Sequence, residues 1–442
     1  MSEPMLWSRL LSAHRLNAPE RFSTPEGGRS NFHRDHDRVI FSSSFRRLGR
    51  KTQVHPLAEN DHLHTRLTHS LEVGSVGRSL GTLVGTAVQA DLPPGFTPED
   101  LGAIVQGACL AHDIGNPPFG HAGEYAIRDW FLDSRQLRLL DDMKRLERLD
   151  LQTYEGNAQS LRVVTQLENH RFDGGMRLTF ATLGTLLKYP WTVEHAGKKG
   201  KFGAFQSEAN ILTQIAEENG LIADGHARWR RHPLSFLMEA ADDICYAILD
   251  LEDGLEVALL GYDEIEPLSL RLAGGTTEEL RAEVSLAPSP RRKIALLRGK
   301  AIGHMVNQCG RAFLEHYAEL MSGEFEGELL KAAGGGLHEA LVEAKALARN
   351  RIFNDRRKVE MEVGAYTTLD ILLDAFCHAT HARHLSTELS FRHRRILDLM
   401  EYDLPQAEWP LYFSFRRVLD FIGGMTDNYA SYLSHQIGGI WK

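Results

Sequence analysis

The sequence has few cysteines and no long apolar run, and each absence narrows the class of protein. Its four cysteines lie far apart among 442 residues and form no CxxC pair, which excludes a disulfide-stabilised scaffold and a cysteine-based zinc site. No apolar stretch approaches the roughly 20 residues of a membrane-spanning helix, and the first residues lack the apolar core of a secretory signal. The net charge of −9 argues against nucleic-acid binding by the whole chain. We therefore expect a cytoplasmic protein that does not associate with membranes.

The sequence also lacks sustained alternation of polar and apolar residues, which is the pattern of a β-strand. Thr97 followed by Pro98 is typical of a helix start. The best hairpin signal, at 173–175, is weak. We expect an all-α fold with at most a minor hairpin. Apolar residues recur at helical spacings over several long stretches, among them 157–167, 233–251, 292–321 and 369–379.

The most informative segment is A-C-L-A-H-D-I-G-N-P-P-F-G-H, Ala108 to His121. It places His112 and Asp113 side by side at the end of an apolar run, followed by a turn rich in glycine and proline. A histidine beside an aspartate offers a metal a neutral imidazole nitrogen and an anionic oxygen from one rigid stretch. The dipeptide alone is common by chance. The apolar helix before it and the small-residue turn after it favour a metal site.

Further metal ligands must come from elsewhere in the chain, and His69 and Asp242 are the candidates. A single histidine among 21 is more often structural or solvated, and an acid on a helix is ordinarily exposed. Asp242, however, lies in apolar surroundings, where an unpaired carboxylate is costly to bury. Together with His112 and Asp113, these residues predict a metal site.

Residues close to these candidates in sequence are suited to binding a phosphorylated substrate. Arg66 precedes His69 by three residues and shares its helical face, so its charge would meet the phosphates of a substrate at the metal. Asp242, Tyr246 and Asp250 are each four residues apart and therefore lie along one face of a helix.

His121 and Glu124 form a candidate pair for proton transfer. If a helix begins after the Pro-Pro turn, the two side chains share a face, and Glu124 can orient and polarise His121. Such a pair is more often a surface contact, but its position directly after the His-Asp segment favours catalysis.

Six segments carry a resemblance to a known family. They are R-D-H-D-R-V-I-F-S-S-S-F-R-R-L-G-R-K-T-Q-V from Arg34, H-T-R-L-T-H-S-L-E-V from His64, the His-Asp segment from Ala108, Y-E-G-N-A-Q-S-L-R from Tyr154, E-A-A-D-D-I-C-Y-A-I-L-D-L-E-D from Glu239 and G-M-T-D-N-Y-A from Gly424. Together they resemble the bacterial deoxynucleoside triphosphate triphosphohydrolases, the dGTPase-like branch of the HD phosphohydrolases, which also includes a vertebrate dNTPase. The F-R-R-L, E-G-N-A-Q and G-M-T-D elements separate this branch from other HD hydrolases.

The resemblance implies an activity and a set of partners. A member of this branch hydrolyses a deoxynucleoside triphosphate to the deoxynucleoside and intact tripolyphosphate, with one divalent ion, Mg²⁺ or Mn²⁺, at each site. Relatives form hexamers or tetramers, some are activated by an effector dNTP, and some bind single-stranded DNA. We expect a single large helical unit over 1–442, with an HD core at about 60–255 and a C-terminal helical region at about 256–442.

The resemblance also implies roles for individual residues. It assigns metal binding to His69, His112, Asp113 and Asp242. It assigns to His121 and Glu124 the control of the attacking water and of the proton on the leaving oxygen. It assigns substrate binding to Gln53, Arg66, Asn116, Tyr246 and Asp250, with Arg66 on the triphosphate and Gln53 at the sugar edge.

Two positions depart from the vertebrate relative. Asn116 stands where that relative has a histidine, so His121 is the expected acid here. Asp243 stands where it has a lysine beside the metal aspartate, so any phosphate contact made by that lysine must come from elsewhere in this chain.

Two basic segments leave alternatives open. Arg46, Arg47, Arg50 and Lys51 are either a solvated helix end or a local site for a polyanionic substrate or single-stranded DNA. The segment around Lys198, Lys199 and Lys201 is a mobile surface loop, a nucleotide lid or a nucleic-acid contact. Two other functions also stay open: another HD-type nucleotide phosphohydrolase, and a nucleotide- or DNA-sensing module with weak activity.

Overall fold

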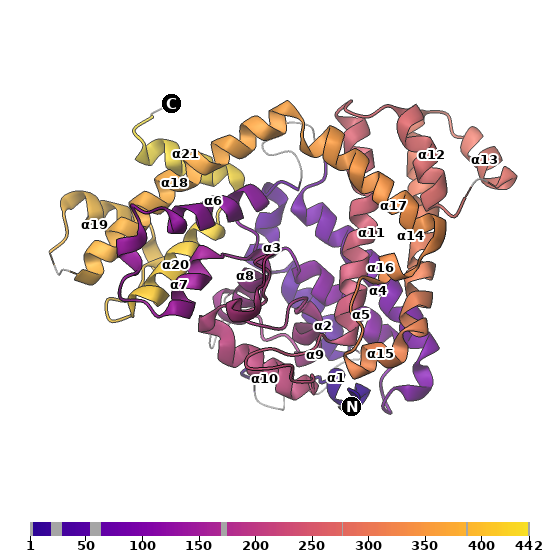
Figure 1. Cartoon of the computed structure of the whole chain (residues 1–442), viewed down its shortest axis with the longest axis horizontal. Helices are drawn as coiled ribbons and strands as arrows, with labels where there is room; N and C mark the ends of the chain where they lie inside the picture. Colours follow the sequence, from indigo (N-terminus) through magenta and orange to yellow (C-terminus); the bar gives the residue numbers. More distant parts are fainter. Residues whose placement is uncertain are drawn as a thin grey trace.

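The computed structural model describes residues 3–18, 29–53, 63–168, 175–275, 277–385 and 388–440 and is all-α, as predicted (Figure 1). Within these ranges the only β-pairing consists of isolated bridges, such as the one between Thr52 and Thr65. Most of the weak hairpin signal at 173–175 lies outside the described residues. No helix in the described ranges is long and apolar enough to cross a membrane.

The helices up to the middle of the chain are α1 (Trp7–Leu10), α2 (Asn31–Ile40), α3 (Ser43–Arg47), α4 (Arg66–Ala87), α5 (Pro98–Ala111), α6 (His121–Leu132), α7 (Arg145–Gln152), α8 (Gly156–Arg162), α9 (Phe180–Leu186), α10 (Ala209–Asn219) and α11 (Pro233–Glu256). The later helices are α12 (Tyr262–Leu272), α13 (Glu278–Ser285), α14 (Pro290–Glu315), α15 (Tyr317–Ser322), α16 (Leu329–Ala332), α17 (Gly335–Ala348), α18 (Arg356–Leu385), α19 (Phe391–Asp398), α20 (Leu411–Gly423) and α21 (Asp427–Ile437). Short 3₁₀ or π segments lie at η2 (Leu48–Arg50), η3 (Gln89–Asp91), η4 (Leu137–Leu140), η5 (Val163–Leu167), η6 (Val193–His195), η7 (Gln206–Glu208), η8 (Arg349–Phe353) and η9 (Glu401–Asp403).

Both helices that carry the histidine candidates begin at well-defined caps. The predicted start at Thr97 is confirmed, because Thr97 is the N-cap of α5 and Pro98 is its first residue. Asp100 completes this cap by accepting a hydrogen bond from the Thr97 backbone N–H at 3.0 Å. At α4 the hydroxyl of Thr65 accepts from the backbone of Thr68, and the hydroxyl of Thr68 accepts from the backbone of Thr65. These caps fix where His69 and His112 fall on their helices.

A row of glycines on α4 lets α5 approach it closely. A methyl group on Gly81 would lie 2.7 Å from the carbonyl oxygen of Leu101, and one on Gly85 would lie 2.7 Å from Cα of Pro98. Farther back along α4, Gly74 faces Leu110 near the end of α5. Early residues of one helix therefore face late residues of the other, so the two helices are antiparallel. This packing brings the start of α4 next to the end of α5, which is where the metal candidates lie.

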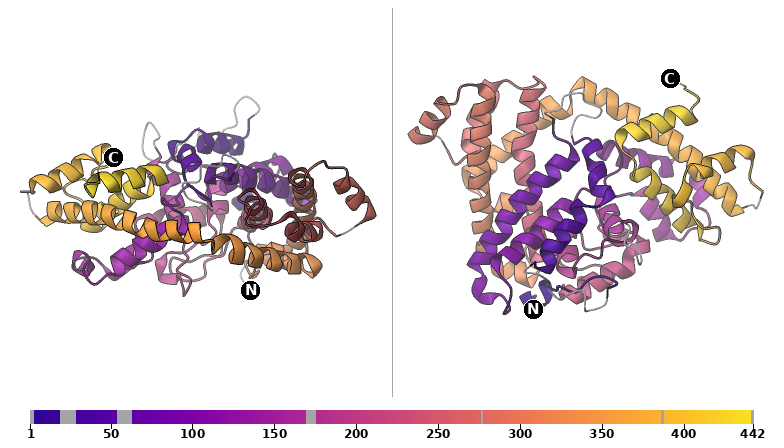
Figure 2. Two further views of the ribbon diagram at one scale, coloured as in Figure 1. Left: turned by 90° about the horizontal axis from the view of Figure 1, so that it is seen from above. Right: turned by 180° about the vertical axis from the view of Figure 1, so that it is seen from behind.

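The buried apolar side chains form two clusters. The first joins α4, α5 and α11 to α12–α17 and includes Ile104 and Phe313, whereas the second joins α6 and α7 to α18–α21 and includes Phe131 and Phe376. The two groups of helices lie toward opposite ends of the molecule (Figure 2), and α18 runs along α6. Each cluster draws helices from both sides of residue 255. The proposed division into an HD core and a C-terminal region stays a prediction.

A buried ionic network joins α8 to α20. The guanidinium of Arg162 donates to both carboxylate oxygens of Asp420, at 2.8 and 2.7 Å, and also to Glu208 at 2.5 Å. All three side chains are buried. An arginine in this position needs both carboxylates, because an uncompensated charge is costly in a low-dielectric environment.

Replacing Asp420 with alanine is expected to destabilise the protein by about 3–5 kcal/mol, because Arg162 would keep a buried charge and lose its bidentate partner. The matched control is Asp398→Ala, which removes an exposed partner of Arg395 and is expected to cost at most about 1 kcal/mol. Urea denaturation of the two variants beside the parent protein measures the difference. Similar unfolding midpoints for both variants would contradict the network's role.

Candidate active site

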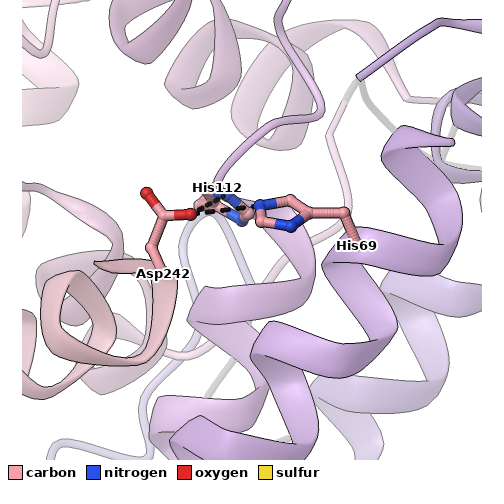
Figure 3. Close-up of side chains that lie close together, drawn as sticks. All are labelled: His69, His112 and Asp242. Atoms are coloured by element: carbon pink, nitrogen blue, oxygen red, sulfur yellow. Dashed lines mark hydrogen bonds and ion pairs between the residues drawn. The ribbon is translucent and has the colours of Figure 1, made fainter. Parts of the chain in front are cut away.

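Three of the predicted metal ligands converge from three helices (Figure 3). His69 lies in the first turn of α4, His112 follows the last residue of α5, and Asp242 lies in the middle of α11. Oδ1 of Asp242 lies 3.1 Å from Nε2 of His69 and 3.5 Å from Nε2 of His112. One ligand atom from each residue lies within 4.8 Å of the others, and this is the only such group found among the described residues. The spacing is suited to a single cation.

The ring of His112 is oriented as a metal ligand would be. Its Nδ1 lies 2.6 Å from the carbonyl oxygen of Cys109, so Nδ1 carries the proton and donates to that oxygen. In the neutral ring Nε2 is therefore the nitrogen that offers a lone pair, and it is buried without a hydrogen-bond partner. Histidine ligands commonly use one ring N–H on a backbone carbonyl in this way and present the other nitrogen to the metal. The residues present therefore fit a divalent ion.

Asp113 lies beside this group but faces other partners. Its Oδ2 accepts from Nη1 of Arg66 at 2.7 Å, and its Oδ1 accepts from Nδ2 of Asn116 at 2.6 Å. Oδ1 is also 3.6 Å from Nε2 of His112, which keeps it at the edge of the candidate site. Asp113 as a fourth ligand stays a prediction.

The charges at the site favour bound positive charge. Burial alone would lower the pKa of His112, but the carboxylates of Asp113 and Asp242 raise it to about 9. Burial would raise the pKa of Asp113, but His112 and Arg66 lower it to about 2. The pKa of Asp242 is lowered as well, chiefly by His112 against the effect of burial. Both carboxylates are therefore ionised at neutral pH and attract a cation.

Arg66 is packed under the turn that follows the His-Asp pair. The turn reverses at Gly120, whose φ of 58° lies in the region that glycine adopts without strain. A side chain on Gly120 would collide with Nη2 of Arg66. The predicted proximity of Arg66 to the metal candidates is thus realised, with Asp113 as its direct partner.

His121 and Glu124 lie in contact on the first turn of α6, which begins at His121 after the Pro-Pro turn. Nδ1 of His121 lies 3.1 Å from Oε2 of Glu124, and the other oxygen of Glu124 accepts from the backbone N–H of Gly156 at 2.8 Å. The side chain of Glu124 is 3% exposed, whereas that of His121 is 73% exposed. A buried carboxylate therefore orients an imidazole that is mostly exposed.

Gln53 and Tyr246 form a second contact beside the metal candidates. Nε2 of Gln53 donates to the hydroxyl of Tyr246 at 2.7 Å, and the Tyr246 ring packs 4.9 Å from the ring of His69. The amide oxygen of Gln53 is buried without a partner. One turn farther along α11, burial and the nearby Asp253 raise the pKa of Asp250 to about 7.

These side chains surround one cavity of about 610 Å³. Helices α17 and α18 close it from the opposite side. Every predicted site residue except His69 lines the cavity, namely Gln53, Arg66, His112, Asp113, Asn116, His121, Glu124, Asp242, Tyr246 and Asp250.

Lysines that the sequence patterns do not single out also line the cavity. Lys188 pairs with Glu239, and Lys345 of α17 pairs with Asp243 at 2.9 Å. A cation therefore does lie beside Asp243, but it comes from a helix about 100 residues away in the sequence. No local spacing signals such a contact, because it depends on how α17 packs against α11.

The two basic segments are partly built into the fold. Lys51 is buried and donates to the carbonyl oxygens of Asn116 and Gly423, each at 2.6 Å, so it is not part of a solvated helix end. Burial and the charge of Arg47 lower the pKa of Lys51 to about 7. In the other segment, Lys201 reaches the cavity whereas Lys198 is exposed.

The G-M-T-D element has a structural position that its sequence does not reveal. The carboxylate of Asp427 accepts from the backbone N–H of Phe119 at 2.9 Å and from that of Thr52 at 3.0 Å. It therefore ties the turn before His121 to the segment that carries Gln53.

The helical fold and this site define an HD-domain phosphohydrolase. The HD domain family model matches residues 66–179. This range includes His69, His112, Asp113, His121 and Glu124. The relatives make the family more specific. A deoxyguanosinetriphosphate triphosphohydrolase-like protein of Pseudomonas aeruginosa is 54% identical over 98% of this chain and 99% of its own length. One from Synechocystis is 37% identical over 99% of this chain and all of its own length.

A deoxyguanosinetriphosphate triphosphohydrolase of an Enterobacter species is 32% identical over 94% of this chain and 96% of its own length. The chain belongs to the deoxyguanosinetriphosphate triphosphohydrolase-like family.

Proposed function

We propose that the protein hydrolyses deoxynucleoside triphosphates to the deoxynucleoside and inorganic tripolyphosphate. The observation that carries this proposal is the buried, unpartnered Nε2 of His112, which lies close to the carboxylates of Asp113 and Asp242 at the wall of the cavity. Carboxylates that favour a proton on this nitrogen also favour a divalent cation in place of that proton. The substrate class follows from the names of the relatives.

One divalent ion, Mg²⁺ or Mn²⁺, would be held by His69, His112, Asp113 and Asp242. When bound, it would supply positive charge against the phosphate oxygens and make a water molecule more acidic. Arg66 and the cavity lysines Lys188 and Lys345 would bind the rest of the triphosphate. Their carboxylate partners hold these cations at the cavity wall, which reduces the entropy lost when phosphate binds.

The sugar would lie against Gln53 and Tyr246. Because the amide N–H of Gln53 is used on Tyr246, its unpartnered Oε1 is an acceptor for a sugar hydroxyl. Asn116 and Asp250 line the same cavity and are the remaining proposed contacts. A buried acceptor left without a donor disfavours ligands that lack the matching hydroxyl.

His121 would protonate the leaving group. Water attacks the α-phosphorus, a new P–O bond forms, and the bond between that phosphorus and the 5′-oxygen breaks. His121 donates a proton to the departing 5′-oxygen, the attacking water releases one proton to solvent, and His121 regains its proton from solvent. Glu124 stabilises the imidazolium before transfer, and its second oxygen is fixed by Gly156.

The experiment that tests this proposal is product analysis by anion exchange, with each dNTP and rNTP and with and without Mn²⁺. Tripolyphosphate as the phosphate product is expected only with added metal. A monophosphate with pyrophosphate, or release of single phosphates, would instead indicate another HD-type phosphohydrolase. DNA binding without turnover of any dNTP would indicate a sensing module.

Hydrolysis in water enriched in heavy oxygen is expected to place the label in the tripolyphosphate and none in the deoxynucleoside. The reason is electrostatic, because the metal candidates and Arg66 all act on oxygens bound to phosphorus. Mass spectrometry of both products measures the distribution. Label in the nucleoside hydroxyl would mean attack at the sugar carbon, which this mechanism does not allow.

Assembly and regulation are proposed from the family. We propose a homo-oligomer, hexamer or tetramer, with an effector dNTP or single-stranded DNA as further ligands. Light scattering alone, and then with each dNTP and with a single-stranded oligonucleotide, measures these properties.

A further inference from the structure

Two acidic side chains next to His121, Glu124 and Glu155, share the guanidinium of Arg128. Nη2 of Arg128 lies 3.8 Å from Oε2 of Glu124 and 3.3 Å from Oε2 of Glu155. Lys201 lies 2.9 Å from the same oxygen of Glu155. Both glutamates are almost completely buried. Glu155 has no part in the proposed reaction, although it lines the same cavity as His121.

The segment around Glu155 fixes Glu124 through its backbone. The carbonyl oxygen of Tyr154 accepts from Nε of Arg128 at 2.7 Å, and the N–H of Gly156 donates to Glu124 at 2.8 Å. A methyl group on Gly156 would lie only 2.6 Å from that carboxylate oxygen, so only glycine permits this approach. The Y-E-G-N segment therefore holds Glu155 at a fixed place beside the His121–Glu124 pair.

Lys201 reaches this cluster from the loop after η6. Its carbonyl oxygen accepts from the indole N–H of Trp191 at 2.8 Å, which anchors the loop. Its ammonium contacts both oxygens of Glu155, at 3.2 and 2.9 Å. Burial raises the pKa of Glu124, but the hydrogen bond and charge of His121 lower it. The charges of Lys201 and Arg128 lower this pKa further. Burial, and then the charge of Glu124, raises the pKa of Glu155.

We propose that Glu155 and Lys201 are positioning residues that set, with opposite signs, the proton affinity of the His121–Glu124 pair. This inference rests on the proposed function in one respect only, namely that the proton held by the His121–Glu124 pair is used in catalysis. Other charged groups also face the pair. They are Arg128, which contacts Glu124, and Arg66, which lies under Gly120; Lys358 and Glu362 of α18 line the same cavity.

The signs follow from Coulomb's law in a site of low dielectric. The negative charge of Glu155 favours a proton on the neighbouring pair, and the positive charge of Lys201 disfavours it. Neutralising Glu155 should therefore move proton uptake by His121 to lower pH, and neutralising Lys201 should move it to higher pH. A role limited to holding the fold predicts no such opposition of sign.

The experiment follows the titration of the His121 imidazole by NMR with carbon-labelled histidine, its signal being assigned by its loss in His121→Gln. Glu155→Gln is expected to shift the midpoint down by about 0.5–1 pH unit and Lys201→Met to shift it up by about as much. The double variant should return close to the parent value. Glu279→Gln on the exposed α13 and Lys199→Met in the same loop as Lys201 are matched controls with no expected shift.

Shifts of the same sign, or shifts no larger than those of the controls, would overturn the proposal. Glu155→Asp and Lys201→Arg keep the charges and are expected to leave the midpoint in place. If Glu155→Gln fails to fold, the upward shift in Lys201→Met, compared with Lys201→Arg and Lys199→Met, carries the test. The titration is measured on the protein alone, so a failure of hydrolysis would overturn the proposed function without affecting this result. Where hydrolysis is observed, the alkaline limb of kcat/KM should move with the NMR midpoint.

Discussion

Replacing Asp242 with alanine is expected to abolish hydrolysis and to weaken Mn²⁺ binding by more than about 100-fold, while the helical fold survives. Among the described residues, Oδ1 of Asp242 is the one carboxylate oxygen that lies within 4 Å of a ring nitrogen of His69 and of one of His112. Without it, the only proposed ligand with a negative charge is Asp113, whose two oxygens already accept hydrogen bonds from Arg66 and Asn116. Alanine is a good helix former, so α11 has no local reason to break. Isothermal titration with Mn²⁺, together with circular dichroism, measures both effects.

The control for this variant is the neighbouring acid. Asp243→Ala removes a carboxylate of the same size one residue away, but Asp243 faces Lys345 rather than the two histidines. It is expected to keep stoichiometric metal. If Asp242→Ala retained the metal and Asp243→Ala lost it, the ligand would be reassigned to the second acid.

The helical class was predictable because its signals are local. The cap at Thr97 and the apolar run after it define α5, and they place His112 at its end whatever the rest of the chain does. The start of α6 after the Pro-Pro turn is equally local, so the contact between His121 and Glu124 could be predicted from their spacing. The approach of His69 to His112 was inferred from a family pattern. Its physical cause, the glycine row on α4, becomes clear only once α5 is packed against it.

The contacts that could not be predicted all depend on distant segments. Lys345 reaches Asp243 from α17, and Lys51 reaches the carbonyl oxygen of Gly423 near the other end of the chain. Composition suggests that a lysine in a basic run is solvated, and burial of Lys51 reverses that expectation. The contacts of Asp113 show that the same dependence on tertiary packing applies to a single side chain. Its position beside His112 was fixed by sequence, but its hydrogen bonds to Arg66 and Asn116 depend on how the turn folds back.

Replacing His121 with alanine is expected to lower kcat by about two to four orders of magnitude while leaving metal binding unchanged. The ring is mostly exposed and contacts no metal candidate, so its removal neither creates a buried cavity nor alters the site of the ion. It does leave Glu124 without the group it orients. Steady-state kinetics and metal content of the purified variant measure the two parts of this expectation.

Arg66→Ala is expected to differ from His121→Ala in two measurable ways. Because Arg66 carries positive charge toward the phosphates in both ground and transition states, its loss should mainly raise KM. Because Arg66 is itself buried and pairs with Asp113, its loss should lower the thermal midpoint more than the loss of the mostly exposed His121 does.

Added imidazole separates the two roles further. The exposed His121 position is open to solvent, so a free imidazole can enter the space left by His121→Ala and transfer the proton in its place. It cannot replace the guanidinium of Arg66, which is buried under Gly120. Partial recovery of kcat with imidazole in His121→Ala alone is therefore the expected outcome. Equal recovery in both variants, or an unchanged kcat in His121→Ala, would assign proton transfer to another residue of the cavity.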